Sequence, residues 1–177
     1  MIDNKIIIRL VLIFLPVACF SYLFHEFRHW VTGEILGNDM SFALNRIDPK
    51  DGNYVNDRHL LWILMGGPLF TIFQALNFQL INEKYRSIYI FPFVFFPFFM
   101  RLLAILFGGF NEQDEPRIAS ILNIDHYIVP LVVLTILFLL LLRGSYILRT
   151  GYQLLGLFCV ISTLCTFLVL GTYSLAR

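Results

Sequence analysis

Long runs of apolar residues, separated by short polar stretches, fill most of this 177-residue chain. A run of about 20 apolar residues is the length that crosses the hydrocarbon core of a bilayer as a helix. The pattern therefore predicts an all-α membrane protein with about five transmembrane helices. The expected spans are Lys5–Gly37, His59–Ile81, Ser87–Phe107, Tyr127–Leu142 and Gly151–Tyr173, with a further short helix over Ile118–Asn123.

The longest polar stretch separates the first two expected spans and contains the segment Asp48-Pro49-Lys50-Asp51-Gly52. Proline suits the first central position of a turn, glycine adopts positive φ, and the flanking residues alternate weakly in polarity. We therefore expect a short β-hairpin over Met40–Val55. An open strand edge beside a membrane is a candidate for holding an extended peptide by strand addition.

Composition supports the membrane assignment and excludes several classes of partner. The chain is 58% hydrophobic and contains 19 phenylalanines, more than a soluble domain of this length needs for its core. Its net charge of +1 offers no basic field, so we expect no nucleic acid partner. Cys19, Cys159 and Cys165 lie in apolar segments without CxxC spacing, which predicts buried, unpaired thiols. We expect an integral multi-pass protein of the cell (inner) membrane.

The first span ends in the segment His25-Glu26-Phe27-Arg28-His29, a His-Glu-x-x-His motif. Residues four apart share one face of a helix, so His25 and His29 can bind the same Zn²⁺. Glu26 lies beside them, where it can accept a proton from a metal-bound water. Polar residues in a membrane helix are costly without a function. The motif therefore predicts a zinc site.

Zinc catalysis needs a third protein ligand and one open position. Successive spans alternate in direction, which places the motif and the acidic loop after Phe107 at one membrane face. Asp114 is the first choice as the third ligand and Glu112 is the second, because Gly108-Gly109 lets the chain bend back toward the motif. Glu115 is expected to cap the following helix. The alternative for this loop is a plain solvated surface.

The second span carries Gly66-Gly67-Pro68 near its start. Glycines allow a substrate or another backbone to approach closely, so Gly66, Gly67 and Pro68 are candidate substrate-binding residues, with helix packing as the alternative. Deeper in this span, Gln74 and Asn77 are expected to form hydrogen bonds with a neighbouring helix. Arg101 in the third span either pairs with a carboxylate near the site or extends to the membrane interface.

Together these motifs resemble the site-2 protease family of intramembrane zinc metalloproteases. The resemblance covers about the first 120 residues and rests on the His-Glu-x-x-His motif, on Gly66-Gly67-Pro68 and on the aspartate loop. It implies that His25, His29 and Asp114 bind Zn²⁺ and that Glu26 is the general base. It also implies a hairpin that clamps the substrate.

Two features depart from the family pattern. The family supplies its aspartate from Asn-x-x-Pro…Asp-Gly, whereas this chain has Asn111-Glu112-Gln113-Asp114-Glu115-Pro116 with no following glycine. The family also has an asparagine soon after the proline of its Gly-Pro helix. Here Asn77 lies nine residues beyond Pro68 and is the candidate substrate or oxyanion donor.

The function implied is hydrolysis of a peptide bond within or next to a membrane-spanning segment, with the lipid bilayer and a membrane-embedded protein substrate as partners. Residues 1–125 would form a metalloprotease-like membrane core, and residues 126–177 would add two transmembrane helices. Two alternatives remain at this point. One is a metal-dependent hydrolase of a lipid or lipidated peptide, and the other is a non-catalytic membrane scaffold that retains a structural metal site.

Overall fold

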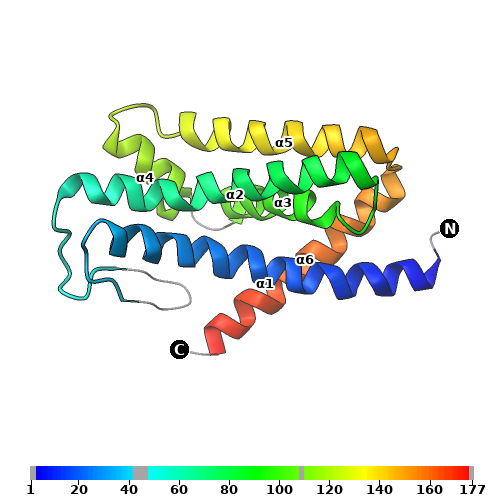
Figure 1. Cartoon of the computed structure of the whole chain (residues 1–177), viewed down its shortest axis with the longest axis horizontal. Coiled ribbons are helices and arrows are strands. Elements are labelled where there is room, and N and C mark those ends of the chain that lie inside the picture. The colour runs from blue at the N-terminus through cyan, green and yellow to red at the C-terminus, as the bar shows by residue number, and fades with distance from the viewer. Residues whose placement is uncertain (1–2, 42–47, 108–109, 176–177) are drawn as a thin grey trace.

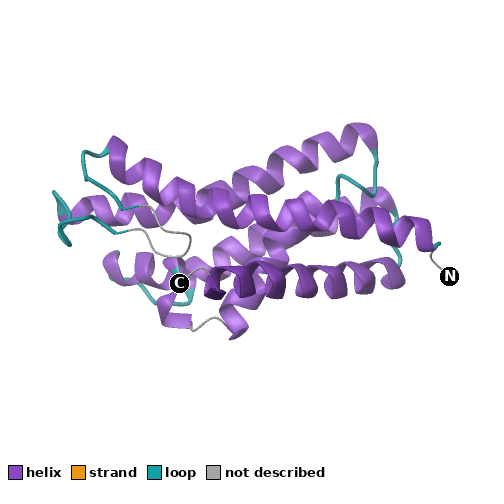
Figure 2. Cartoon of the chain, turned by 90° about the horizontal axis from the view of Figure 1, so that it is seen from below, coloured by secondary structure: helices purple, strands orange, loops and turns teal. Residues whose placement is uncertain are grey.

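The computed structural model describes residues 3–41, 48–107 and 110–175, and within these ranges it is built from helices and loops (Figures 1 and 2). The all-α prediction is therefore confirmed for the described residues. In chain order the helices are α1 (Asn4–Ile35), α2 (Asp57–Tyr85), α3 (Pro92–Phe107), the 3-10 helix η1 (Phe110–Glu112), α4 (Asp114–Ile121), α5 (Ile128–Leu148) and α6 (Tyr152–Leu175).

Helices α1, α2, α5 and α6 are long and apolar enough to cross a membrane, which makes this a multi-pass membrane protein. The expected span over Ser87–Phe107 is shorter in the structure. Helix α3 begins only at Pro92, because proline is well tolerated in the first turn of a helix, and residues 88–91 form a turn. Its 16 residues extend about 24 Å, less than the hydrocarbon core of about 30 Å.

Helix α3 is the centre of the bundle rather than a lipid-facing span. It contacts α1, α2, α5 and α6, and half of its 16 residues are buried. Phe95 of α3 meets Phe14 of α1 and Phe158 of α6, with ring centroids 6.3 and 5.4 Å away. Aromatic pairs of this kind contribute about 0.5–1.5 kcal/mol each beyond burial of their area. This packing fixes α3, and with it Arg101, between the long helices.

The C-terminal half of α1 lies beside the N-terminal half of α2 (Figure 1). A buried hydrogen bond joins the two helices, in which Gln74 Nε2 donates to Ser21 Oγ at 2.9 Å. The expected bond from Gln74 to a neighbouring helix is therefore confirmed. Asn77 differs, because its side chain donates to the Phe73 carbonyl of its own helix at 2.7 Å.

The loop between α1 and α2 contains no strand in its described part, so the β-hairpin expected over Met40–Val55 is wrong there. Residues 42–47 of that segment lie outside the described residues. What forms is a single antiparallel bridge between Met40 and Pro49. Two backbone hydrogen bonds close this bridge, from Ser41 N to the Asp48 carbonyl at 2.9 Å and from Lys50 N to the Asp39 carbonyl at 2.8 Å.

Side chains, rather than a sheet, hold this loop against the end of α1. Asn38 is buried, and its amide donates to the Gly33 carbonyl at 3.1 Å while its Oδ1 accepts from the Val55 backbone at 3.0 Å. Glu34 Oε1 accepts from the Met40 backbone at 2.9 Å. These contacts tie both ends of the loop to the last turns of α1.

Two smaller expectations also need correction. All three cysteines are free, as predicted, but only Cys165 is buried, whereas Cys19 and Cys159 face outward from the bundle. Helix α4 begins at Asp114, four residues before the expected start at Ile118, because acidic residues and proline both suit a first helical turn.

Candidate metal centre

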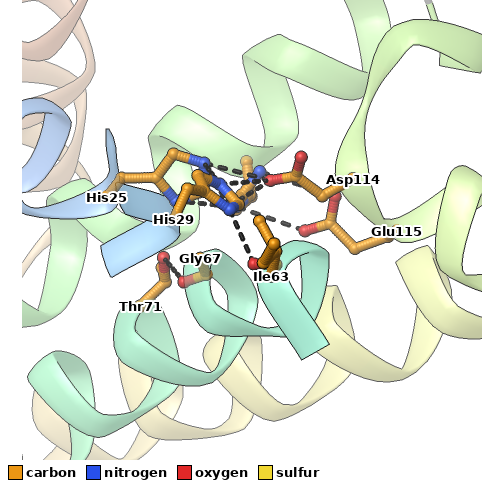
Figure 3. Close-up of polar contacts among 8 residues, drawn as sticks. His25, His29, Ile63, Gly67, Thr71, Asp114 and Glu115 are labelled. Carbon is orange, nitrogen blue, oxygen red and sulfur yellow. Dashed lines mark hydrogen bonds and ion pairs between the residues drawn. The ribbon is translucent and has the colours of Figure 1, made fainter. Parts of the chain in front are cut away.

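Three side chains that are far apart in the sequence meet at one end of the bundle. His25 and His29 project from successive turns of α1, and Asp114 projects from the first turn of α4 (Figure 3). Asp114 Oδ2 lies 3.1 Å from His25 Nε2 and 3.3 Å from His29 Nε2, and the two Nε2 atoms are 3.2 Å apart. The structure thus brings together the three residues that the sequence singled out as ligands.

The backbone of α2 determines which nitrogen of His29 carries a hydrogen. His29 Nδ1 lies 2.7 Å from the Ile63 carbonyl oxygen, which can only accept, so Nδ1 is the donor. A neutral His29 ring then has its lone pair on Nε2, directed at the carboxylate oxygen of Asp114. Two electron-rich atoms at this distance need either a proton on Nε2 or a bound cation between them. A backbone carbonyl that orients a histidine in this way is a recurrent feature around bound metals.

The spacing of the three donor atoms fits a tetrahedral ion. Metal–ligand distances of about 2.0–2.1 Å place the donors of a tetrahedral zinc site about 3.3–3.4 Å from one another. The three separations here, 3.1, 3.2 and 3.3 Å, form a nearly equilateral triangle of almost that size. Two imidazoles and one carboxylate are also a donor set of catalytic zinc sites, which keep a fourth position open. The residues present therefore fit Zn²⁺.

Asp114 is available as an anionic donor. Burial on its own would raise the pKa of this carboxyl, but its polar contacts with His25 and His29 outweigh burial and hold the pKa well below its usual range. Its position in the first turn of α4 also favours a negative charge, because the helix dipole is positive there. Asp114 is therefore a carboxylate at neutral pH.

A buried ion pair lies directly behind Asp114. Arg101 of α3 and Glu115 of α4 are both almost inaccessible, and Arg101 Nε lies 3.2 Å from Glu115 Oε1. Of the two alternatives for Arg101, pairing with a carboxylate near the site is the one observed. The expectation that Glu115 caps its helix is wrong, since Gln113 occupies the N-cap position and Glu115 is held by Arg101. The pair fixes α4 to α3 one residue away from Asp114.

Arg101 also contacts His25. Its Nη2 lies 3.0 Å from His25 Nδ1, and a guanidinium can only donate, so Nδ1 is the acceptor in this arrangement. A neutral His25 ring then carries its hydrogen on Nε2, where it donates to Asp114. A metal ion bound through Nε2 would need the ring hydrogen on Nδ1, so the guanidinium would have to turn away from Nδ1 while it stays paired with Glu115.

Glu26, the expected general base, is half-buried on α1 and interacts electrostatically with His29 and Asp114. The second choice for the third ligand, Glu112, lies in η1, but its side chain is outside the described part of the structure. The two other histidines have different neighbours. His59 Nδ1 lies 3.2 Å from the amide of Asn38, and the His126 ring packs at a tilt against Tyr127 with centroids 4.0 Å apart.

The Gly-Gly-Pro segment brings α2 against α1. A Cβ atom on Gly67 would lie 2.1 Å from His25 Cε1, and one on Gly66 would lie 3.2 Å from Thr32 Oγ1. The structure thus places α1, rather than open space, against both glycines. Pro68 follows inside α2, and the Thr71 hydroxyl donates to the Gly67 carbonyl at 2.9 Å in the same turn (Figure 3).

Asn77, the other candidate substrate contact, is not brought to this site. It lies ten residues beyond Gly67 on α2, which corresponds to about 15 Å along the helix axis. The sequence reasoning missed Ile63, whose contribution to the site comes from its backbone carbonyl. It also missed that Glu115 is the partner of Arg101.

Comparison with known proteins identifies no relative, since no family model, curated protein or solved structure matches this chain. The resemblance to the site-2 protease family therefore rests on the motifs of the sequence itself. Any functional conclusion has to come from the chemistry of the donor triangle and of the groups around it.

Proposed function

We propose that this protein is an intramembrane zinc metallopeptidase that cleaves a peptide bond within or next to a membrane-spanning segment. The observation that carries the proposal is the triangle formed by His25 Nε2, His29 Nε2 and Asp114 Oδ2, with sides of 3.1–3.3 Å. When bound there, Zn²⁺ supplies Lewis-acid polarisation of the scissile carbonyl and activation of water.

The chain's own residues have separate roles in this proposal. His25, His29 and Asp114 would hold the ion, and the Ile63 carbonyl keeps the His29 lone pair directed into the donor triangle. Glu26 accepts a proton from the attacking water and delivers it to the leaving amine. Its place on α1, directly after a ligand and within electrostatic range of His29 and Asp114, supports this role.

The surroundings of the triangle favour a membrane-embedded substrate. The histidines are buried residues of α1, a helix with the length and apolarity of a membrane span, and the site is enclosed by α2, α3 and α4. A substrate helix uses its carbonyls in internal hydrogen bonds. The substrate segment must therefore unwind locally before one of its carbonyls can reach the ion.

The decisive experiment compares Glu26→Gln with wild type and with Glu34→Gln, a matched change on the same helix. Glu34 accepts from the Met40 backbone, and the glutamine oxygen can still do so. We expect Glu26→Gln to retain stoichiometric zinc while cleavage of synthetic transmembrane peptides in nanodiscs falls by about 10²–10⁴-fold. Glu34→Gln should retain both zinc and cleavage.

Mass spectrometry of the products in ¹⁸O-water identifies the reaction, because hydrolysis puts the label in the new carboxyl group. Full cleavage by Glu26→Gln would contradict the proposed base. Zinc binding without any hydrolysis by wild type would favour a non-catalytic scaffold. Release of a labelled fatty acid from lipid, with intact peptides, would favour a lipid hydrolase.

A further inference from the structure

A second feature lies at the opposite end of the bundle from the metal centre, where α2 and α5 both end (right-hand side of Figure 1). A cavity of about 540 Å³ opens there, with Arg86, Arg149, Ser145 and Thr150 in its lining. This volume is typical of small-molecule sites. Arg86 lies 19 residues beyond Gly67 on α2, about 28 Å away along the axis, so the cavity is separate from the donor triangle.

The two arginines of the cavity have an unusual backbone conformation. Arg86 ends α2 with φ 47° and ψ 49°, and Arg149 ends α5 with φ 51° and ψ 43°, both in the left-handed region. Helices normally end in this way on glycine or asparagine, because a larger side chain is strained there. Asn123, after α4, follows that rule. Backbone conformation therefore does not account for the choice of arginine at either position.

The charges at this end are not balanced within the protein. Arg143 is paired with Glu83, but neither Arg86 nor Arg149 has a carboxylate partner among the described residues. None of the described residues that line the cavity is acidic. The hydroxyls of Ser145 and Thr150 contact each other in its wall and add hydrogen-bonding capacity. Two guanidinium forks with nearby hydroxyls are the groups that recognise phosphate oxygens.

Exposed tyrosines place the cavity at the level of the lipid headgroups. Tyr85, Tyr146 and Tyr152 are 63%, 85% and 94% exposed, and all three lie at this end of the bundle. Tyrosines are enriched where a membrane protein passes from hydrocarbon to water. Basic pockets between transmembrane helices at this level bind anionic headgroups.

We propose that this cavity binds the phosphate group of an anionic phospholipid, with Arg86 and Arg149 as its charged ligands. A soluble phosphate compound offers the same chemistry. The position among exposed tyrosines favours the lipid, whose phosphate lies at that depth. This inference is independent of the proposed peptidase activity.

The test is native mass spectrometry of the full chain released from mixed phosphatidylglycerol and phosphatidylcholine nanodiscs. We compare wild type with Arg86→Asn/Arg149→Asn, in which asparagine tolerates the left-handed conformation. The matched control is Lys84→Gln/Arg143→Gln, which removes the same charge at the same end but outside the proposed site. Each arginine near an anionic headgroup contributes about fivefold in affinity, so the asparagine variant should lose about 25-fold in phosphatidylglycerol retention. The control should stay within about threefold of wild type.

Equal losses in both double variants would overturn the proposal, because they would show diffuse attraction rather than a built site. Absence of any preference for phosphatidylglycerol in wild type would overturn it as well. Displacement of the lipid by inorganic phosphate at equal concentration would assign the cavity to a soluble phosphate compound and refute the lipid assignment. An unchanged melting temperature and zinc content of the asparagine variant verify that its fold is intact.

Discussion

Gly67 allows α2 to approach His25 more closely than any other residue would permit. In Gly67→Ala the new Cβ would lie 2.1 Å from His25 Cε1 and 2.6 Å from Nδ1. The ring cannot simply retreat, because Arg101 and Asp114 already contact it at 3.0 and 3.1 Å. Either the two helices separate or the ring rotates out of the donor triangle. Overpacking of this kind costs about 1–3 kcal/mol of stability.

The structure also gives the size of the required movement. Ordinary van der Waals contact begins at 3.4 Å, so the Cβ and the ring must separate by at least 1.3 Å, the difference between 3.4 and 2.1 Å. Metal sites tolerate ligand displacements of only about 0.2 Å. We therefore expect zinc affinity to fall by about 100-fold, the upper range for changes that displace a ligand indirectly.

The neighbouring glycine supplies the control. In Gly66→Ala the Cβ would lie 3.2 Å from the Thr32 hydroxyl oxygen, which can rotate away, and 3.5 Å from the Arg28 carbonyl. Alanine also gains up to about 1 kcal/mol in helix propensity over glycine. The free energy of unfolding of Gly66→Ala should therefore stay within about 1 kcal/mol of the wild-type value. Its zinc affinity should equal that of wild type.

The assay is zinc affinity by chelator competition, together with the visible spectrum of the Co²⁺ form, which reports whether four-coordinate geometry survives. Thermal unfolding with and without zinc gives the stability change in the same samples. Zinc affinity of Gly67→Ala within about threefold of wild type would refute the reasoning, since a site built on His25 cannot absorb that displacement. An equal loss of zinc affinity in Gly66→Ala would show that the loss comes from general disturbance of α1–α2 packing and not from displacement of His25.

Three further changes test the groups around the triangle. Asp114→Asn keeps the side-chain size but removes the anionic donor, so zinc affinity should fall by at least about 10–100-fold in chelator competition. Arg101→Gln leaves Glu115 buried without its partner and should cost about 3–5 kcal/mol in chemical unfolding, most of which Arg101→Gln/Glu115→Gln should restore. Ser21→Ala leaves the Gln74 amide unpaired and should lower the free energy of unfolding by about 1–3 kcal/mol. Ser21→Ala/Gln74→Leu removes both polar groups, so its free energy of unfolding should be close to the wild-type value.

The meeting of His25, His29 and Asp114 was predictable because each step of the inference follows from helix geometry and span counting. The four-residue spacing of His25 and His29 fixes a common face of α1, and the alternating direction of the spans brings the loop with Asp114 to the same end. The contribution of Ile63 was not predictable, because every residue has a backbone carbonyl and the residue type does not indicate which one contacts His29. Glu115 beside a proline has the same local pattern whether it caps its helix or pairs with Arg101.

Hydropathy alone also misjudged α3 and the first loop. A helix that is apolar on all sides has the same hydropathy whether it faces lipid or lies among other helices. Helix α3 lies among α1, α2, α5 and α6. The turn residues Pro49 and Gly52 correctly indicate a reversal of the chain. Whether strands form on either side depends on competing contacts such as those of Asn38, which no local pattern contains.

The charge balance of the buried site separates the Arg101–Glu115 pair from the Asp114 carboxylate. Arg101 and Glu115 cancel each other, so their pair contributes position rather than charge. With neutral histidines, the Asp114 carboxylate leaves one negative charge in a largely desolvated space, and uncompensated charge there is expensive. A cation in the donor triangle neutralises this charge, and a divalent cation would also favour ionisation of the neighbouring Glu26. Electroneutrality and the spacing of the three donor atoms thus both favour a bound cation.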